Sequence, residues 1–126
     1  MRQRYQDCQP YLTKDGSTIR ELIHPNLQPG CRQSLAEASV PANSATLLHC
    51  HKSSEEIYFI TAGAGAMTLG DRKIMVHQGD SILIRPGTPH KIENTGDSTL
   101  KILCCCTPPY AHHDTEIMIQ EPEFYK

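Results

Sequence analysis

Two histidines one residue apart, followed by a pair of carboxylates, form the stretch of this sequence with the clearest chemical potential. It reads HCHKSSEE over residues 49–56. In a β-strand the side chains of residues i and i+2 leave the same face, so His49 and His51 are expected to point the same way. A short turn at 52–54 would return a carboxylate toward them. Imidazoles and a carboxylate that converge can bind a divalent metal ion, so the stretch predicts a metal site.

A second stretch carries a third histidine. It reads GDSILIRPGTPHKIEN over residues 79–94. A glycine turn, a short apolar strand and a rigid Pro-Gly turn come before His90, and this order would place His90 against the first stretch. Four other histidines, at positions 24, 77, 112 and 113, are expected to be structural or exposed.

Short apolar runs separated by turn residues surround both stretches. Residues 56–61 are rich in β-branched and aromatic side chains and give the strongest strand prediction. Further runs lie at 45–51, 66–69, 73–76, 81–84, 90–93 and 99–106. Residues 18–24 fit a strand or one helical turn equally well. With no βαβ alternation and no long amphipathic helix, the pattern predicts an all-β sandwich or barrel.

Composition sets limits on partners and compartment. The chain has 126 residues and a formal net charge of −2, which suits one domain and gives no reason to expect nucleic acid or an anionic membrane as partner. The apolar runs are too short for a membrane span, and the N-terminus lacks the apolar core of a signal peptide, so the expected compartment is the cytoplasm. Six cysteines without a Cys-x-x-Cys pair, three of them consecutive at 104–106, are expected to be reduced and mostly buried.

The two stretches together resemble the cupin superfamily. Its first motif reads Gly, five residues, His-x-His, three or four residues, Glu, six residues, Gly, and its second reads Gly, five residues, Pro-x-Gly, two residues, His, three residues, Asn. The positions that fit are His49, His51, Glu56, Gly63, Gly79, Gly87, His90 and Asn94. Asn43 replaces the first glycine, a change that a left-handed turn tolerates, and Arg85 replaces the first proline.

The resemblance implies a double-stranded β-helix, or jelly-roll, cupin barrel over residues 33–107, with an N-terminal arm or extra strands at 1–32 and a C-terminal segment at 108–126. It implies a homodimer as well. The metal ligands carried over by position are His49, His51, Glu56 and His90. Glu55 is the competing carboxylate, and counting back from Gly63 favours Glu56.

The expected cofactor is one divalent first-row transition metal ion: iron, manganese, nickel, zinc or copper. The expected function is that of a metal-dependent enzyme, either an oxygenase of the dioxygenase type or an isomerase or lyase, acting on a small polar substrate. The alternative is a metal-stabilised module that binds a small molecule without turnover. Tyr58 shares the face of Glu56 and is a candidate cavity residue, and Cys104 and Cys106 share one face of the last long strand. Arg85 is a candidate for binding an anionic substrate or for an exposed salt bridge.

Overall fold

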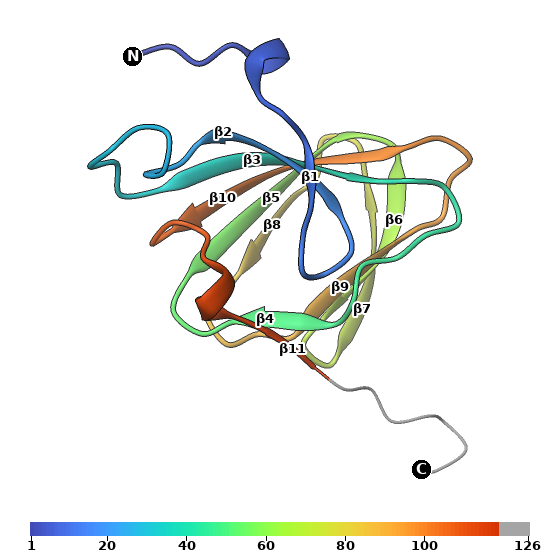
Figure 1. Ribbon diagram of the computed structural model, residues 1–126. Helices are drawn as coiled ribbons and strands as arrows, with labels where there is room; N and C mark the ends of the chain where they lie inside the picture. Colours follow the sequence, from blue (N-terminus) through green and yellow to red (C-terminus); the bar gives the residue numbers. More distant parts are fainter. Residues whose placement is uncertain (119–126) are drawn as a thin grey trace.

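The computed structural model describes residues 1–118 as two antiparallel β-sheets packed face to face (Figure 1). One sheet has the strand order β1-β2-β3-β10-β5-β8, and the other has the order β11-β4-β9-β6-β7. The strands are β1 Tyr11–Leu12, β2 Thr18–Ile23, β3 Ser34–Val40, β4 His49–His51, β5 Glu55–Ala62, β6 Ala64–Leu69, β7 Arg72–His77, β8 Ser81–Ile84, β9 His90–Asn94, β10 Leu100–Thr107 and β11 Thr115–Ile117. Two short 3-10 turns lie at Tyr5–Asp7 (η1) and His112–Asp114 (η2). The predicted all-β, double-stranded β-helix architecture is confirmed.

The core lies between the two sheets. Along β5 burial alternates with the pleat, so that Glu56, Tyr58 and Ile60 face inward and Ile57 and Phe59 face outward. The largest fully buried apolar side chains are Ile60, Met67, Val76, Ile84, Ile92, Leu100 and Ile102. This packed layer holds the strands that carry the histidines in fixed positions.

The N-terminal residues join the six-stranded sheet. The segment 18–23 forms strand β2 and not a helical turn, and β2 pairs with β3 from Thr18 opposite Ser39 to Ile23 opposite Leu35. Strand β1 forms a hairpin with β2. Through this pairing the hairpin of β1 and β2 extends the barrel wall of the same chain.

The strand predicted at 45–51 is wrong in its first half. Strand β4 covers His49–His51, and Ala45 makes an isolated bridge to Glu93. The amide of Thr46 donates to Ile92 O, whereas the amide of Leu47 donates to Asp15 O. Asp15 lies in the turn between β1 and β2, so Leu47 has a turn and not a strand as its partner, and a regular ladder does not form there.

Turns and termini complete the frame of the site. Asn43, where the motif has glycine, adopts a positive φ of 61°, so this asparagine supports the left-handed turn. Within the C-terminal segment, β11 (Thr115–Ile117) pairs with β4, and residues 119–126 lie outside the described residues. All six cysteines are free thiols. No helix among residues 1–118 is long and apolar enough to cross a membrane.

Candidate metal centre

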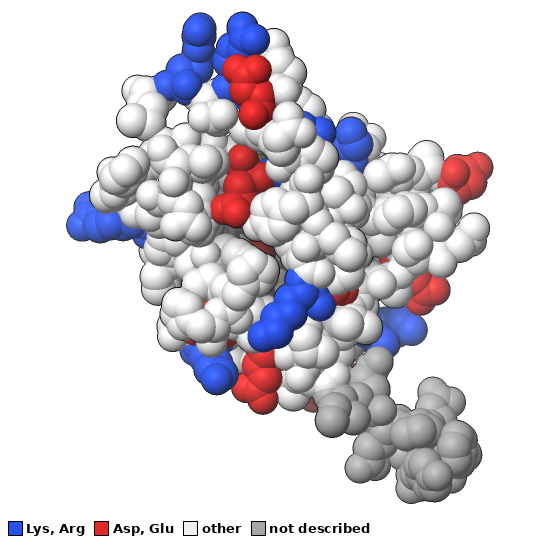
Figure 2. Space-filling view, in the orientation of Figure 1, with Lys and Arg blue, Asp and Glu red and all other residues white. Residues whose placement is uncertain are grey.

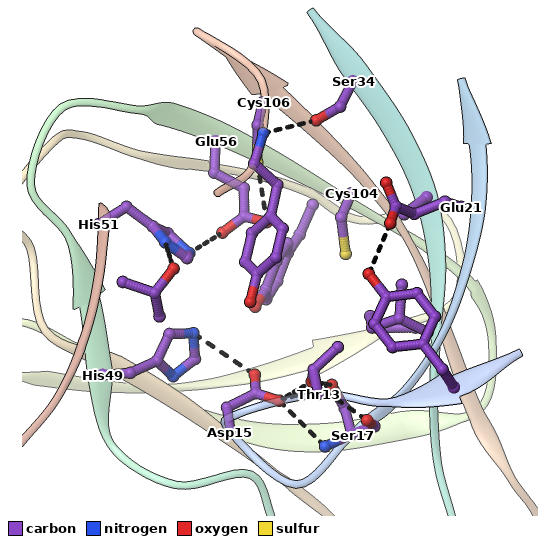
Figure 3. A pocket seen from close by; sticks show the side chains of 17 residues that line it. Thr13, Asp15, Ser17, Glu21, Ser34, His49, His51, Glu56, Cys104 and Cys106 are labelled. Carbon is purple, nitrogen blue, oxygen red and sulfur yellow. Dashed lines mark hydrogen bonds and ion pairs between the residues drawn. The ribbon is translucent and has the colours of Figure 1, made fainter. Parts of the chain in front are cut away.

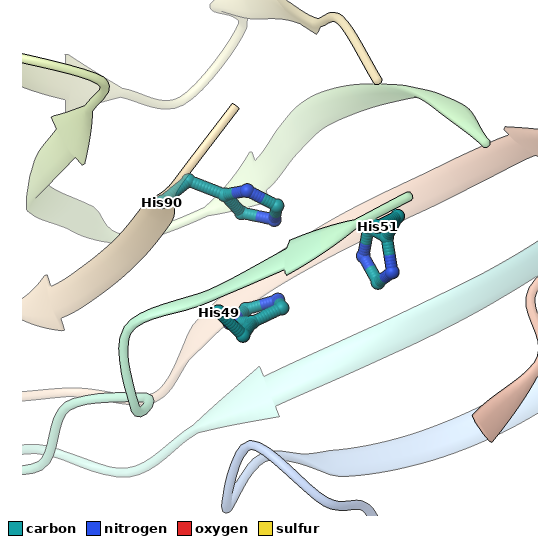
Figure 4. Close-up of side chains that lie close together, drawn as sticks. All are labelled: His49, His51 and His90. Carbon is teal, nitrogen blue, oxygen red and sulfur yellow. The ribbon is translucent and has the colours of Figure 1, made fainter. Parts of the chain in front are cut away.

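Three histidines converge between the sheets. His49 and His51 leave the same face of β4, and His90 on β9 is the register partner of His49. One ring nitrogen from each lies within 4.8 Å of the others (Figure 4). All three side chains are buried, and His90 has no exposed surface. The second stretch is held against the first because the amide of Gly87, in the Pro-Gly turn before His90, donates to His51 O at 2.7 Å.

Hydrogen bonds fix the tautomer of each ring. His49 Nδ1 donates to Leu47 O at 2.7 Å, and His90 Nδ1 donates to Thr88 O at 2.9 Å, because a carbonyl oxygen can only accept. His51 Nδ1 lies 3.0 Å from Thr115 Oγ1, whose own proton goes to Ala111 O. Each ring therefore carries its proton on Nδ1, which leaves the Nε2 lone pair free as a ligand.

Glu56 enters the same cluster from β5. Its Oε1 lies 3.1 Å from His51 Nε2 and 3.5 Å from His90 Nε2. Burial by itself would raise the pKa of Glu56, but the close contacts with the rings of His51 and His90 lower it to about 2. Glu55, the competing carboxylate, is exposed and lies 3.9 Å from Arg85 in a surface ion pair.

Burial and charge act differently on the histidines. Burial, together with the neighbouring His90, lowers the pKa of His49 and favours its neutral ring. Burial acts to lower the pKa of His51 as well. The Glu56 carboxylate has the larger effect, and the pKa of His51 is raised. Glu56 Oε1 and His90 Nε2 are completely buried and have no hydrogen-bond partner among the described residues. Unpaired buried acceptors are costly, and a cation bound between them would remove that cost.

A cavity of about 50 Å³ opens beside the cluster (Figure 3). Its volume suits a few water molecules or one small organic molecule. It lies between β1, β2, β3, β5 and β10 on one side and β4 and β11 on the other, and its lining includes the predicted cavity residue Tyr58. The full lining is Tyr11, Thr13, Asp15, Ser17, Ile19, Glu21, Ser34, Ala36, Ala38, His49, His51, Glu56, Tyr58, Cys104, Cys106, Tyr110 and Thr115.

Comparison with known families agrees with this geometry. The model of the Cupin domain family matches residues 36–106, which is more than half of the chain and includes all three histidines and Glu56. This chain is a cupin.

The proteins similar to this cupin carry different functional descriptions. An uncharacterized protein of Methanocaldococcus jannaschii is 61 % identical over 114 residues, which are 90 % of this chain and 91 % of that one. An oxalate-binding protein of Thermotoga maritima is 34 % identical over 68 residues, 54 % of this chain and 56 % of the other. The crystal structure of the polyketide cyclase RemF from Streptomyces resistomycificus superimposes with a TM-score of 0.80 at 22 % identity, covering 99 % of this chain and 89 % of that one, and shows likeness of fold.

Several cavity residues of the cupin were missed from the sequence, Asp15 and Thr115 among them. Asp15 lies in the β1–β2 hairpin, where Asp-Gly-Ser signals only a turn, yet its Oδ2 lies 3.5 Å from His49 Nε2. Thr115 lies in β11, far along the chain from His51. Neither position could be found from spacing, because each depends on which strand an end of the chain joins.

The cysteines of the cavity are protonated thiols. Burial, with the nearby Glu56 carboxylate, raises the pKa of both Cys104 and Cys106. Cys106 Sγ donates to Glu56 Oε2 at 3.4 Å, so it holds the carboxylate from the side away from the histidines' contact atom. Neither sulfur belongs to the group of converging ligand atoms, which consists of His49, His51 and His90. Burial likewise raises the pKa of Tyr58 well above its usual value, which keeps the phenol protonated.

Proposed function

We propose that this cupin is a metal-dependent enzyme that holds one divalent first-row transition metal ion through His49, His51, Glu56 and His90. The observation that carries the proposal is the set of three Nε2 lone pairs, fixed by Nδ1 hydrogen bonds, that face a buried carboxylate oxygen without a partner. Three neutral imidazoles and one carboxylate suit iron, manganese, nickel, zinc or copper. The residues present therefore fit such an ion.

The proposed reaction is of the isomerase or lyase type on a small polar substrate. When bound, a divalent ion would supply Lewis-acid polarisation of a substrate oxygen. The chain itself supplies a cavity between the sheets that excludes bulk water, and Asp15 is placed to hold a substrate hydroxyl beside His49.

Elemental analysis of untagged protein, purified without added metal, tests the ligand set. We expect about one equivalent of a first-row metal in the wild type and a loss of at least tenfold in His51→Ala and His90→Ala, because a buried ligand is removed. His77→Ala is the matched control, since His77 is an exposed histidine of β7 and should keep the metal. Unchanged metal content in His51→Ala and His90→Ala would contradict the proposed set of metal ligands.

The same preparations separate the reaction classes. Protein loaded with zinc or with iron is incubated with a panel of small hydroxylated compounds, and products and oxygen uptake are measured. Turnover with zinc supports an isomerase or lyase. Turnover that needs iron and consumes oxygen indicates a dioxygenase, and a ligand-dependent rise in melting temperature without product indicates a binding module.

We propose in addition that the cupin is a homodimer. Support comes from the outward face of the larger sheet, where Ile57, Phe59 and Leu83 are 45 %, 41 % and 43 % exposed. Ile57 is the register partner of Leu83, so these side chains form one apolar surface across β5 and β8. The solvated face of an antiparallel sheet is usually polar, and apolar surface there is typical of an interface.

A further inference from the structure

Three carboxylates line the cavity. Asp15 comes from the β1–β2 hairpin, Glu21 from β2 and Glu56 from β5, and none of the described lining residues is Lys or Arg. Their side chains are 14 %, 22 % and 6 % exposed. Lys14 neighbours Asp15 in sequence, but its ammonium donates to Thr115 O at 2.8 Å and to His112 O. On the face seen in Figure 2, charged side chains of both signs are scattered among the described residues without a continuous basic patch.

The hydroxyl groups next to these carboxylates already donate to the protein. Thr13 Oγ1 and Ser17 Oγ each donate to Asp15 Oδ1 at 2.7 Å, and the amide of Ser17 donates to the same oxygen at 3.0 Å. Tyr11 OH donates to Glu21 Oε1 at 2.6 Å. One oxygen of Asp15 and one of Glu21 are thus held by the chain, and the second oxygen of each is left over.

The second carboxylate oxygens of Asp15 and Glu21 need hydrogen-bond donors from other groups. Asp15 Oδ2 faces His49 Nε2, which is itself an acceptor, since His49 carries its proton on Nδ1. Glu21 Oε2 is fully buried and has no hydrogen-bond partner among the described residues. Its neighbour at 3.6 Å is His24 Nδ1, and this nitrogen accepts from the amide of Asn26, so it has no proton to give.

The cavity lining therefore offers more free hydrogen-bond acceptors than free donors. With Glu56 Oε1 assigned to the metal ion, Asp15 Oδ2 and Glu21 Oε2 remain. Among the described residues, Tyr58 is the lining hydroxyl whose proton has no acceptor. Figure 3 shows Glu21 across the cavity from His49 and His51, so the acceptors are present at both ends. A buried acceptor without a donor costs free energy that a ligand with donors would recover.

We propose that the cavity binds an uncharged small molecule with hydrogen-bond donors at both ends, such as hydroxyl or amide groups, and discriminates against small dianions. One donor group of the ligand bonds Asp15 Oδ2 next to the histidines, and another bonds Glu21 Oε2 at the far end. A dianion of the same size meets two carboxylates in surroundings that screen charge poorly. This inference rests on the proposed function and names the substrate class of the same site.

A series of three probes of one shape tests it. Oxamide, oxamate and oxalate differ in charge from zero to −2 and in their number of donors. Affinities are measured by isothermal titration calorimetry on metal-loaded and metal-stripped protein, with metal content determined in each sample. We expect oxamide to bind more tightly than oxamate, and oxamate more tightly than oxalate, in the metal-stripped form. In the metal-loaded form, the divalent ion should attract the carboxylates of oxalate and reduce or reverse this difference.

Isosteric substitutions of the two carboxylates should reverse this order. In Asp15→Asn with Glu21→Gln, oxalate affinity should rise about tenfold, the size of effect typical of removing a nearby like charge, and oxamide affinity should fall. Glu55→Gln is the matched control, because Glu55 is an exposed carboxylate outside the cavity, and it should leave all three affinities unchanged.

The outcomes separate this inference from the proposed function. Tighter binding of oxalate than oxamide by the metal-stripped wild type, an unchanged order in the metal-stripped double variant, or no binding of any probe would overturn the inference. The expected order in protein that takes up no metal would contradict the proposed function and leave the inference standing.

Discussion

At the scale of single residues, the site depends on partners that set which nitrogen of each ring is free. For His49 and His90 these partners are carbonyl oxygens of the preceding turns, Leu47 O and Thr88 O, two residues back in the chain. For His51 the partner is the hydroxyl of Thr115, which sits in register with it on β11. A side-chain partner can be removed without changing the backbone, so the contribution of tautomer control is measurable at His51.

Thr115→Val should weaken metal binding while leaving the ligands in place. Valine keeps the shape of threonine but cannot accept the proton of His51 Nδ1, so the ring loses the bond that directs its Nε2 lone pair. Loss of such a partner lowers metal affinity by roughly 10- to 100-fold. Competition with a fluorescent chelator measures it.

Thr46→Val is the control for this comparison. Thr46 Oγ1 is also buried and accepts from a backbone amide, that of Ile92, which is not one of the proposed ligands. It should lower stability without changing metal affinity. Equal metal affinity in Thr115→Val and the wild type would show that the hydroxyl does not control the ring.

Sequence spacing was sufficient for the histidines and insufficient for Asp15 and Thr115. The period of two along a strand puts His49 and His51 on one face whatever the rest of the chain does. The Pro-Gly turn before His90 likewise restricts where β9 begins. Asp15 and Thr115 reach the cavity only because their segments contact parts of the chain that are distant in sequence. A local sequence pattern does not indicate such contacts.

At the scale of elements, the two ends of the described chain close the site over the short strand β4. The N-terminal hairpin accepts the amide of Leu47 through Asp15 O, and β11 pairs along the full length of β4. The turn η2 holds the β4–β5 connection as well, because Asp114 accepts from the amides of Ser53 and Ser54. The position of His51 and Glu56 on either side of this connection therefore depends on Asp114.

The stability contributed by Asp114 should depend on pH. Burial would raise the pKa of Asp114, but hydrogen bonds from Ser53 and Ser54 outweigh it and hold the pKa below its usual value. A carboxyl whose pKa is lower in the folded than in the unfolded state stabilises the fold above the unfolded value and loses that effect as pH falls through the folded value. Asp114→Asn should cost about 1 kcal/mol at pH 7, and the difference should shrink below about pH 4.

Urea denaturation of both proteins at pH 7, 5 and 3.5 measures this difference. Asp97→Asn is the control, since Asp97 is exposed in the β9–β10 turn and should change little at any of these values. A destabilisation by Asp114→Asn that is equally large at pH 3.5 and pH 7 would contradict a role for the carboxylate charge.

At the scale of the whole molecule, the inward and outward faces of the larger sheet have unusual compositions. The inward face carries carboxylates and histidine contacts where a barrel usually packs apolar groups, and the outward face of β5 and β8 carries Ile57, Phe59 and Leu83 where water would favour polar ones. The alternation itself was predictable from the sequence. The inward carboxylate Glu56 and the outward apolar residues of β5 are explained if a ligand or metal ion covers the first and a second copy of the chain covers the others.

The double substitution Ile57→Glu with Phe59→Glu should convert a dimer into a monomer. In the wild type, light scattering coupled to size-exclusion chromatography should give twice the chain mass of 14.1 kDa. Two carboxylates in the apolar surface would be desolvated on association, so the variant should give the mass of one chain. Met75→Glu, at an exposed methionine of β7 in the other sheet, should remain dimeric. A monomeric wild type, or a double variant that stays dimeric, would mean that this surface does not join two copies.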